Sequence, residues 1–204
     1  MGTQRRPYLV MKLTKELVLG SQSPRRAQFL KDLGLTFTAL PLDLDETAPA
    51  HLSPVETATF VSELKAEALL PLLQKGQIGL TSDTEVWQGG RRFGKAGDTA
   101  AATEMLEALS GTTHEVHSSM TLIDPDKLMP MSSVVSTVVV HFHPIPQWAI
   151  DHYIKTYKPF DKAGAYGIQE WIGQAYIKRI EGNYNSVVGL DTAALVHVLA
   201  PYFQ

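Results

Sequence analysis

The stretch LVLGSQSPRRAQFL, residues Leu17–Leu30, decides how this chain begins to fold. Its first residues have the hydrophobicity of a short buried strand, and they run into a glycine, two serines, a proline and a pair of arginines. Ser23 suits the N-cap of a helix and Pro24 suits its first position. An apolar stripe follows, and Gly34 is typical of a helix end. The stretch therefore predicts a strand that leads directly into a helix.

The same junction carries the residues of an anion site. A helix N-terminus presents unpaired backbone N–H groups and the positive end of the helix dipole. Ser21 and Ser23 add hydroxyl donors, and Arg25 and Arg26 add guanidinium groups that match phosphate oxygens. This composition indicates phosphate. The residues alone suit an N-capped helix with two solvated arginines at least as well, because Ser-Pro is a common helix opening.

Helices and strands alternate over the first half of the chain, and a β-rich centre follows. We predict further helices over residues 53–76, 99–109, 146–157 and 191–203. Strands or extended segments are predicted over residues 35–47, 78–90, 91–98, 113–124 and 131–144, with a turn at Gly89 and Gly90, and loop and strand over residues 160–190. This order predicts an α/β protein with a mixed sheet.

Length and composition bound the organisation and the classes of protein. The 204 residues suit one domain, which we expect over residues 15–204 after an N-terminal extension over residues 1–14. The chain has no cysteine, which excludes a disulfide framework and a thiolate nucleophile and fits a reducing cytoplasm. A net charge of -3 argues against a general nucleic-acid or membrane-surface binder. No apolar run approaches the roughly 20 residues that span a bilayer.

Carboxylates gather in two short motifs. DLDET supplies Asp43, Asp45 and Glu46, and TSDTEV supplies Asp83 and Glu85 where a buried strand ends. Carboxylates beside a phosphate site suggest Mg²⁺ or Mn²⁺, because hard cations take oxygen ligands and commonly bridge substrate phosphates. Spacing alone does not distinguish this site from a polar loop and a turn aspartate.

Three lysines occupy distinct settings. Lys65 lies inside a predicted helix, where a lysine is ordinarily solvated. Lys95 in FGKAGD and Lys162 in FDKAGAYG lie in glycine-bearing loops, where backbone and ammonium can both approach a ligand. Loops carry function more often than helix faces do.

Eight short motifs, in order and spacing, resemble the Maf family of nucleotide pyrophosphatases, the septum-formation proteins. They are SQSPRR, DLDET, SELKAEAL, TSDTEV, GKAGD, LSGTTHEV, DKAGAYGIQ and IEGNYNSVVGL. The resemblance implies a two-lobed α/β fold around a deep nucleotide cleft, similar to the inosine-triphosphate pyrophosphatases, often as a homodimer. It also implies hydrolysis of a nucleoside triphosphate to the monophosphate and pyrophosphate, dependent on a divalent cation.

The resemblance carries over residue by residue. The serines and arginines of SQSPRR fall where the family is expected to bind the triphosphate. Glu46 and Asp83 fall on its acidic positions, which implies a metal-binding and water-activating pair. The lysines Lys65, Lys95 and Lys162 match those expected to contact phosphates and neutralise developing charge.

The segment after the third lysine resembles the subtype that acts on dTTP and UTP. Gln169 is therefore the expected specificity residue, because an amide can both donate to and accept from the edge of uracil or thymine. The chain departs from the family at Ser82, which adds a hydroxyl beside the catalytic carboxylate, and at Ala96 and Asp191, where prolines are usual. We expect the lost prolines to loosen loops more than they alter chemistry.

Two other functions stay open at this point. The chain could be a nucleotide-binding regulator of cell division with little catalysis, or a pyrophosphatase for modified nucleotides such as methylated GTP. Retention of the acidic pair and the three lysines argues against a pure binder. Two histidines, His141 and His143, have a spacing that can bind zinc, but no third ligand is evident. His114 is expected to be structural.

Overall fold

One mixed sheet organises the chain, as predicted from the sequence. The computed structural model describes residues 11–127, 129 and 131–204. The sheet has seven strands in the order β2-β1-β3-β5-β6-β7, with β4 paired to β3. The strands are β1 (Glu16–Leu19), β2 (Phe37–Ala39), β3 (Gln77–Gln88), β4 (Arg91–Phe93), β5 (Thr113–Ile123), β6 (Met131–Phe142) and β7 (Ile177–Glu181). β1 is parallel to β2 and β3, whereas the other pairs are antiparallel.

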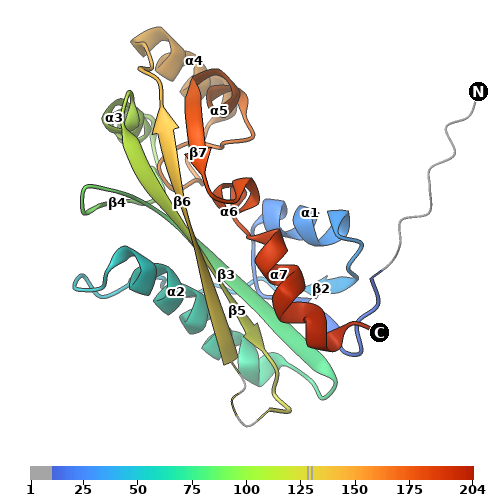
Figure 1. Ribbon diagram of the computed structural model, residues 1–204. Helices are drawn as coiled ribbons and strands as arrows, with labels where there is room; N and C mark the ends of the chain where they lie inside the picture. The colour runs from blue at the N-terminus through green and yellow to red at the C-terminus, as the bar shows by residue number, and fades with distance from the viewer. Residues whose placement is uncertain (1–10, 128, 130) are drawn as a thin grey trace, which may run out of the picture.

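Helices cover the sheet and its ends (Figure 1). They are α1 (Pro24–Asp32), α2 (Pro54–Leu69), α3 (Thr99–Leu109), α4 (Gln147–Tyr157), α5 (Trp171–Tyr176), α6 (Tyr184–Val188) and α7 (Thr192–Leu199), with one-turn 3₁₀ helices at Leu70–Leu72 and Ala200–Tyr202. Among the described residues, none of these helices is long and apolar enough to cross a membrane.

The strand-to-helix junction forms as the sequence predicts. The Ser23 hydroxyl accepts a hydrogen bond from the backbone N–H of Arg26, and Pro24 opens α1. Gly34 follows the end of the helix with a φ of 73°, a left-handed conformation that glycine adopts without strain. Strand β1, the junction and α1 are therefore fixed by local signals.

Three predicted segments differ in the structure. The helix predicted over residues 191–203 ends as an α-helix at Leu199, and only a 3₁₀ turn follows at Ala200–Tyr202. The helix predicted over residues 53–76 ends as an α-helix at Leu69 and continues only as a single 3₁₀ turn. Pro71 has no N–H to give to the helix, so the α-helical hydrogen bonding stops there although Leu70 itself is still helical. The segment over residues 160–190, predicted as loop and strand, also contains α5 and α6. These helices of six and five residues carry too little periodicity to detect.

The predicted extension over residues 1–14 lies largely outside the described residues. Of the four described positions, Met11 forms an isolated bridge with Leu35, and Leu13 forms one with Phe203. The side chains of Met11 and Leu13 also pack against the core beside α1 and α7. This part of the extension is thus attached to the fold.

Three long strands connect the two larger of three hydrophobic clusters, which we call the two cores. At one end of β3, β5 and β6, Val86 and Val116 pack with residues of α3, α4 and α5. Toward the other end, Leu80 and Met120 pack with residues of α1 and α7. Figure 1 shows these strands running from the group α3, α4 and α5 to the group α1 and α7. The two cores correspond to the two lobes that the family resemblance implies.

A gap in strand pairing lies between the two cores. One edge of β3 pairs with β1 only as far as Leu80, and the same edge pairs with β4 only from Val86 onward. Across residues 81–85 no described strand pairs with this edge, while β5 pairs with the opposite edge throughout. Because β3 outruns β1, one edge of a polar and largely buried segment, Thr81–Glu85, has no described strand beside it between the lobes.

His114 is a core residue, in line with the structural role expected for it. Its Nε2 lies 2.8 Å from the hydroxyl of Tyr166, and its ring stacks on Phe142. Burial lowers the pKa of the imidazole to about 4. In the unfolded state the imidazole keeps an ordinary pKa near 6.5. Between pH 6.5 and about pH 4 the unfolded state therefore binds more protons than the folded state. The stability contributed by neutral His114 is therefore full above about pH 6.5 and is lost as the pH falls toward 4.

We expect His114→Gln to flatten this dependence. The shift from 6.5 to about 4 corresponds to about 3 kcal/mol of wild-type stability lost on acidification. Urea unfolding at pH 7 and pH 4.5 measures the loss in each variant. His143→Gln, at an exposed histidine, is the matched control and should retain the wild-type slope. Equal acid sensitivity in His114→Gln and wild type would contradict the assignment.

Candidate functional site

A cleft opens over the unpaired segment of β3. Its volume is about 670 Å³, and both lobes contribute its walls. All ten residues predicted for the site line it: Ser21, Ser23, Arg25, Arg26, Glu46, Lys65, Asp83, Lys95, Lys162 and Gln169. Residues as far apart in sequence as the first strand-to-helix junction and the loop before α5 therefore meet in one cavity.

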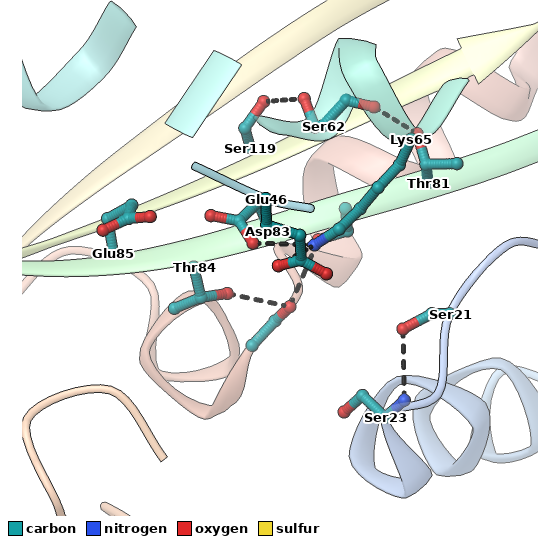
Figure 2. A network of polar contacts seen from close by, with 12 residues as sticks. Ser21, Ser23, Glu46, Ser62, Lys65, Thr81, Asp83, Thr84, Glu85 and Ser119 are labelled. Carbon is teal, nitrogen blue, oxygen red and sulfur yellow. Dashed lines mark hydrogen bonds and ion pairs between the residues drawn. The ribbon is translucent and has the colours of Figure 1, made fainter. Parts of the chain in front are cut away.

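Lys65 joins the two predicted acidic residues. Its Nζ lies 2.9 Å from Oδ1 of Asp83 and 3.0 Å from Oε2 of Glu46, as Figure 2 shows. Lys65 comes from α2, Asp83 from the unpaired segment of β3, and Glu46 from the loop after β2. Lys65 is only 7% exposed and Asp83 only 8%. Lys65 is therefore buried, although a lysine within a helix is ordinarily solvated.

The electrostatics of Asp83 favour a buried carboxylate. Burial alone would raise its pKa, but the attraction of Lys65 and Arg26 outweighs burial and holds the pKa below its usual range. Its Oδ2 is buried and has no hydrogen-bond partner among the described residues. One oxygen of an ionised carboxylate is thus anchored by Lys65, whereas the other has no such anchor among the described residues.

A buried hydroxyl network fixes α2 against the sheet one turn before Lys65. The Ser62 hydroxyl lies 2.7 Å from that of Ser119 and 2.9 Å from that of Thr121. Thr81 donates to the backbone carbonyl of Ser62 at 2.7 Å (Figure 2). Sequence reasoning missed these residues, because hydroxyls on a helix and two strands become neighbours only once the packing is known. The network sets the position from which Lys65 reaches Asp83.

The Arg26 side chain is buried and connects several segments of the fold by hydrogen bonds. Its side chain donates to the Gly189 carbonyl at 2.9 Å, to the Ser21 hydroxyl at 3.2 Å and to the Thr84 hydroxyl at 3.1 Å. It therefore connects the start of α1 to β3 and to the loop before α7. Arg25 differs, because it is partly exposed and lies 3.4 Å from Asp161 across the cleft. The alternative of two solvated arginines is wrong for Arg26.

The opposite wall is held by a second polar cluster. Lys162 lies 3.0 Å from Oδ1 of Asp161 and 3.2 Å from Oε1 of Glu170. The Tyr153 hydroxyl hydrogen-bonds the other oxygen of Glu170 and accepts the backbone N–H of Gly167 at 3.0 Å. One tyrosine of α4 thereby links both ends of the loop that carries Gln169.

Gln169 and Lys95 are placed for contact with a ligand. The amide oxygen of Gln169 is buried, and no described residue gives it a hydrogen bond. Buried polar atoms in native proteins are normally paired, so this oxygen is a candidate for a ligand contact. Lys95 is exposed on the cleft, and its backbone forms an isolated bridge with Ala163.

Glu85 is paired with Arg92, which the sequence analysis did not identify as a site residue. Arg92 of β4 donates to both of its carboxylate oxygens, at 2.6 and 2.5 Å. Burial raises the pKa of Glu85 to about 7 against the opposing effect of Arg92. The TSDTEV motif offered two carboxylates as cation ligands. Asp83 remains a candidate for that role, whereas both oxygens of Glu85 are bonded to Arg92.

The departures at Ser82 and Asp191 have structural explanations. Successive residues of a strand point to opposite faces, so Ser82 does not lie beside the carboxylate of Asp83 as expected. Its hydroxyl instead lies 3.4 Å from the Gly189 carbonyl. Asp191 caps α7 by accepting from the backbone N–H of Ala194 at 3.0 Å, and it also accepts from Ser136 at 2.5 Å. At position 191 the departure supplies a helix cap, which offsets the missing proline.

The donor set at Glu46 and Asp83 suits a hard cation. Two carboxylates, one with a buried oxygen that receives no hydrogen bond from the described residues, offer the ligands that Mg²⁺ and Mn²⁺ prefer. Within the part of the chain that the structure describes, no three His, Cys, Asp or Glu residues gather as a metal site. A cation here would therefore also need oxygens from substrate or water, which is usual for Mg²⁺ at phosphate sites. His141, considered for zinc, instead contacts Glu181 and Thr113.

Fold and site together define an α/β protein with a cleft suited to a polyphosphate. Hydroxyls, a helix N-terminus and five predicted cationic side chains surround two carboxylates. The chain belongs to the family described as Maf-like protein, which it matches over residues 16–202.

Curated relatives match almost the whole chain. It is 41% identical to the dTTP/UTP pyrophosphatase of Flavobacterium johnsoniae, covering 90% of this chain and 93% of that protein. It is 36% identical to the dTTP/UTP pyrophosphatase of Bacteroides thetaiotaomicron, covering 88% and 92%. A crystal structure of a nucleoside-triphosphatase / dITP/XTP pyrophosphatase from Mycobacterium abscessus is similar with a TM-score of 0.42 and 15% identity, covering 92% of this chain and 94% of that one. A likeness this distant says nothing of the chemistry.

Proposed function

We propose that this protein hydrolyses dTTP and UTP to the nucleoside monophosphate and pyrophosphate. The observation that carries the proposal is the contact of Lys65 with both Glu46 and Asp83 on the floor of a cation-lined cleft. Relatives named dTTP/UTP pyrophosphatase over about nine-tenths of the chain support the same substrate class.

In this proposal, the side chains of the cleft have different roles according to where they lie. Ser21, Ser23 and the N-terminus of α1 hold phosphate oxygens, and Arg25 adds a guanidinium at the rim of the cleft. Asp83 is ionised at neutral pH, because Lys65 and Arg26 hold its pKa below the usual range. Its Oδ2, which no described residue contacts by a hydrogen bond, accepts the proton of the attacking water. Positioned charges of this kind supply most of the acceleration in phosphoryl transfer.

The lysines neutralise the charge that develops as pyrophosphate leaves. Lys65 lies at the carboxylate pair, Lys95 is exposed on one wall, and Lys162 is held by Glu170 on the other. Glu46 and Asp83 would hold Mg²⁺ or Mn²⁺, which supplies Lewis acidity at the phosphate when bound. The cleft residues themselves hold the substrate in one orientation relative to the attacking water.

Gln169 reads the base in this proposal. Its buried amide oxygen has no hydrogen-bond partner among the described residues. This oxygen accepts from N3–H of uracil or thymine, while the amide nitrogen donates to a base carbonyl. The oxygen and nitrogen of an amide are distinguished by their hydrogen bonds, so a bound pyrimidine fixes the orientation of this side chain.

Pyrophosphate release from a panel of nucleotides tests the proposal. The panel holds dTTP, UTP, ATP, GTP and 7-methyl-GTP, each with Mg²⁺, with Mn²⁺ or with EDTA. We expect cation-dependent release from dTTP and UTP, which Gln169→Leu lowers by roughly tenfold to a hundredfold because a hydrogen bond to the base is lost. Gln147→Leu, an exposed glutamine of α4, is the matched control.

Other outcomes of this panel identify the alternatives. Preferred turnover of 7-methyl-GTP would replace the pyrimidine assignment by modified nucleotides. Tight binding without release from any triphosphate would indicate a nucleotide-binding regulator of septum formation instead of an enzyme.

Three accompanying features belong to the same proposal. We propose that residues 15–204 act as one catalytic domain, that the protein forms a homodimer, and that it works in the cytoplasm, where its nucleotide substrates are. Sedimentation equilibrium at micromolar concentration measures the oligomeric state directly.

A further inference from the structure

The pair formed by Glu85 and Arg92 lies in the cleft but has no part in the function proposed above. Both residues line the cavity, Glu85 from the unpaired segment of β3 and Arg92 from β4. The Glu85 side chain is 5% exposed, whereas that of Arg92 is 38% exposed. The carboxylate is thus buried beneath a guanidinium that reaches the open space of the cleft.

The hydrogen bonds of the pair leave part of the guanidinium free for a ligand. Nε and Nη2 of Arg92 donate to the two oxygens of Glu85 in a bidentate arrangement. A guanidinium has five N–H donors in a fixed plane, so the Nη1 group keeps its donors while its orientation is set by Glu85. Bidentate pairing to a buried carboxylate therefore aims a cation without consuming it.

The surroundings of Arg92 place it near the reacting end of the cleft. Glu85 follows Asp83 by two residues, so both side chains leave the same face of β3. Figure 2 shows Glu85 and Asp83 on this same strand, with Glu85 further along it. The charges of Asp83 and Glu46 also act on Arg92 and help raise its pKa. A guanidinium in this field can meet a phosphate that is bound at the two carboxylates.

Arg91, the neighbouring arginine of β4, shows that a positive charge on this strand does not by itself bring a side chain into the cleft. Arg91 lies outside the cleft, 2.7 Å from Glu104 of α3, and its guanidinium covers the ring of Phe93. Alternation along the strand sends Arg91 and Arg92 to opposite faces. An ion pair with a buried carboxylate is weak support for stability by itself, because desolvation of the carboxylate offsets the attraction. The placement of Arg92 thus calls for a role beyond holding the sheet together.

We propose that Arg92 is a further phosphate-binding residue of this cleft and that Glu85 is its positioning residue. The ligand is the polyphosphate of a nucleoside triphosphate, and the contact is an ion-paired hydrogen bond from the free Nη1 group. This inference rests on the proposed function, because it takes the same substrate in the same cavity. It adds a cation from β4 to those predicted from the sequence.

Isothermal titration with α,β-methylene-UTP and Mg²⁺ tests the inference without relying on turnover. The compared proteins are wild type, Arg92→Ala, the matched control Arg91→Ala, and the double variant Glu85→Leu/Arg92→Met. We expect Arg92→Ala to bind roughly tenfold to a hundredfold more weakly, as for loss of a charge-assisted hydrogen bond. Arg91→Ala should stay within about twofold of wild type.

The double variant separates binding from folding. It replaces the buried carboxylate and its guanidinium partner together with apolar side chains of similar size, a change that is often neutral for stability. Weak binding in this variant, at a wild-type melting temperature, supports the inference. Recovery of tight binding in the double variant would show that Arg92 only neutralises Glu85 and would overturn it, as would equal affinities of Arg92→Ala and Arg91→Ala. Failure of the wild-type protein to bind the analogue would instead refute the proposed function.

Discussion

Asp83→Asn is expected to lower pyrophosphate release from dTTP and UTP by roughly a thousandfold or more while the protein stays folded. The change removes the negative charge that contacts Lys65 at 2.9 Å and the buried oxygen that has no partner in the described structure. General-base catalysis alone contributes roughly 10²- to 10⁴-fold, and loss of a cation ligand adds to this. The amide has nearly the same size, so the packing around β3 should persist.

The measurement is the rate of pyrophosphate release at saturating Mg²⁺, with circular dichroism and thermal unfolding on the same preparation. Asp151→Asn is the matched control, because Asp151 lies on α4 outside the cleft and, among the described residues, accepts only from Gln147. It should release pyrophosphate at the wild-type rate. Near-normal turnover of folded Asp83→Asn would remove Asp83 from the mechanism.

Local signals predicted the parts of the fold that depend on adjacent residues. The Ser23 cap of α1 formed as expected, and Ser53 opens α2 with a reciprocal capping box to Glu56. The turn at Gly89 and Gly90 also formed, with positive φ at both residues, the conformation that matches the twist of a hairpin. Each of these features is specified within a few residues of the chain, so a single sequence contains enough information to locate it.

Contacts across the sheet could not be predicted in the same way. The approach of Lys65 to Asp83 depends on how α2 sits on β3, which the hydroxyls of Ser62 and Ser119 help to fix. The pairing of Glu85 with Arg92 depends on the register of β3 and β4. The motifs indicated which residues belong to the site, but their partners and burial follow only from long-range packing.

The short helix α5 shows the same limit and has the largest expected effect on stability. Gly173 lies within α5, and a Cβ atom built there would lie 2.0 Å from the carbonyl oxygen of Ile168 and 2.5 Å from its carbonyl carbon. Backbone atoms cannot rotate away as a flexible side chain can, so the loop that carries Gln169 must move. From helix propensity alone, Gly173→Ala would stabilise the protein by up to about 1 kcal/mol. The close approach predicts the opposite sign.

We therefore expect Gly173→Ala to destabilise the fold by about 3 kcal/mol or more, which lowers the melting temperature by about 6 to 12 °C for a chain of this length. Gly94→Ala is the control for stability, because a Cβ there meets nothing within 4 Å. Differential scanning calorimetry of both variants measures the difference. A melting temperature of Gly173→Ala at or above that of wild type would mean that α5 is free to shift. The packing of α5 against Ile168 would then no longer explain how Gln169 is held at the cleft.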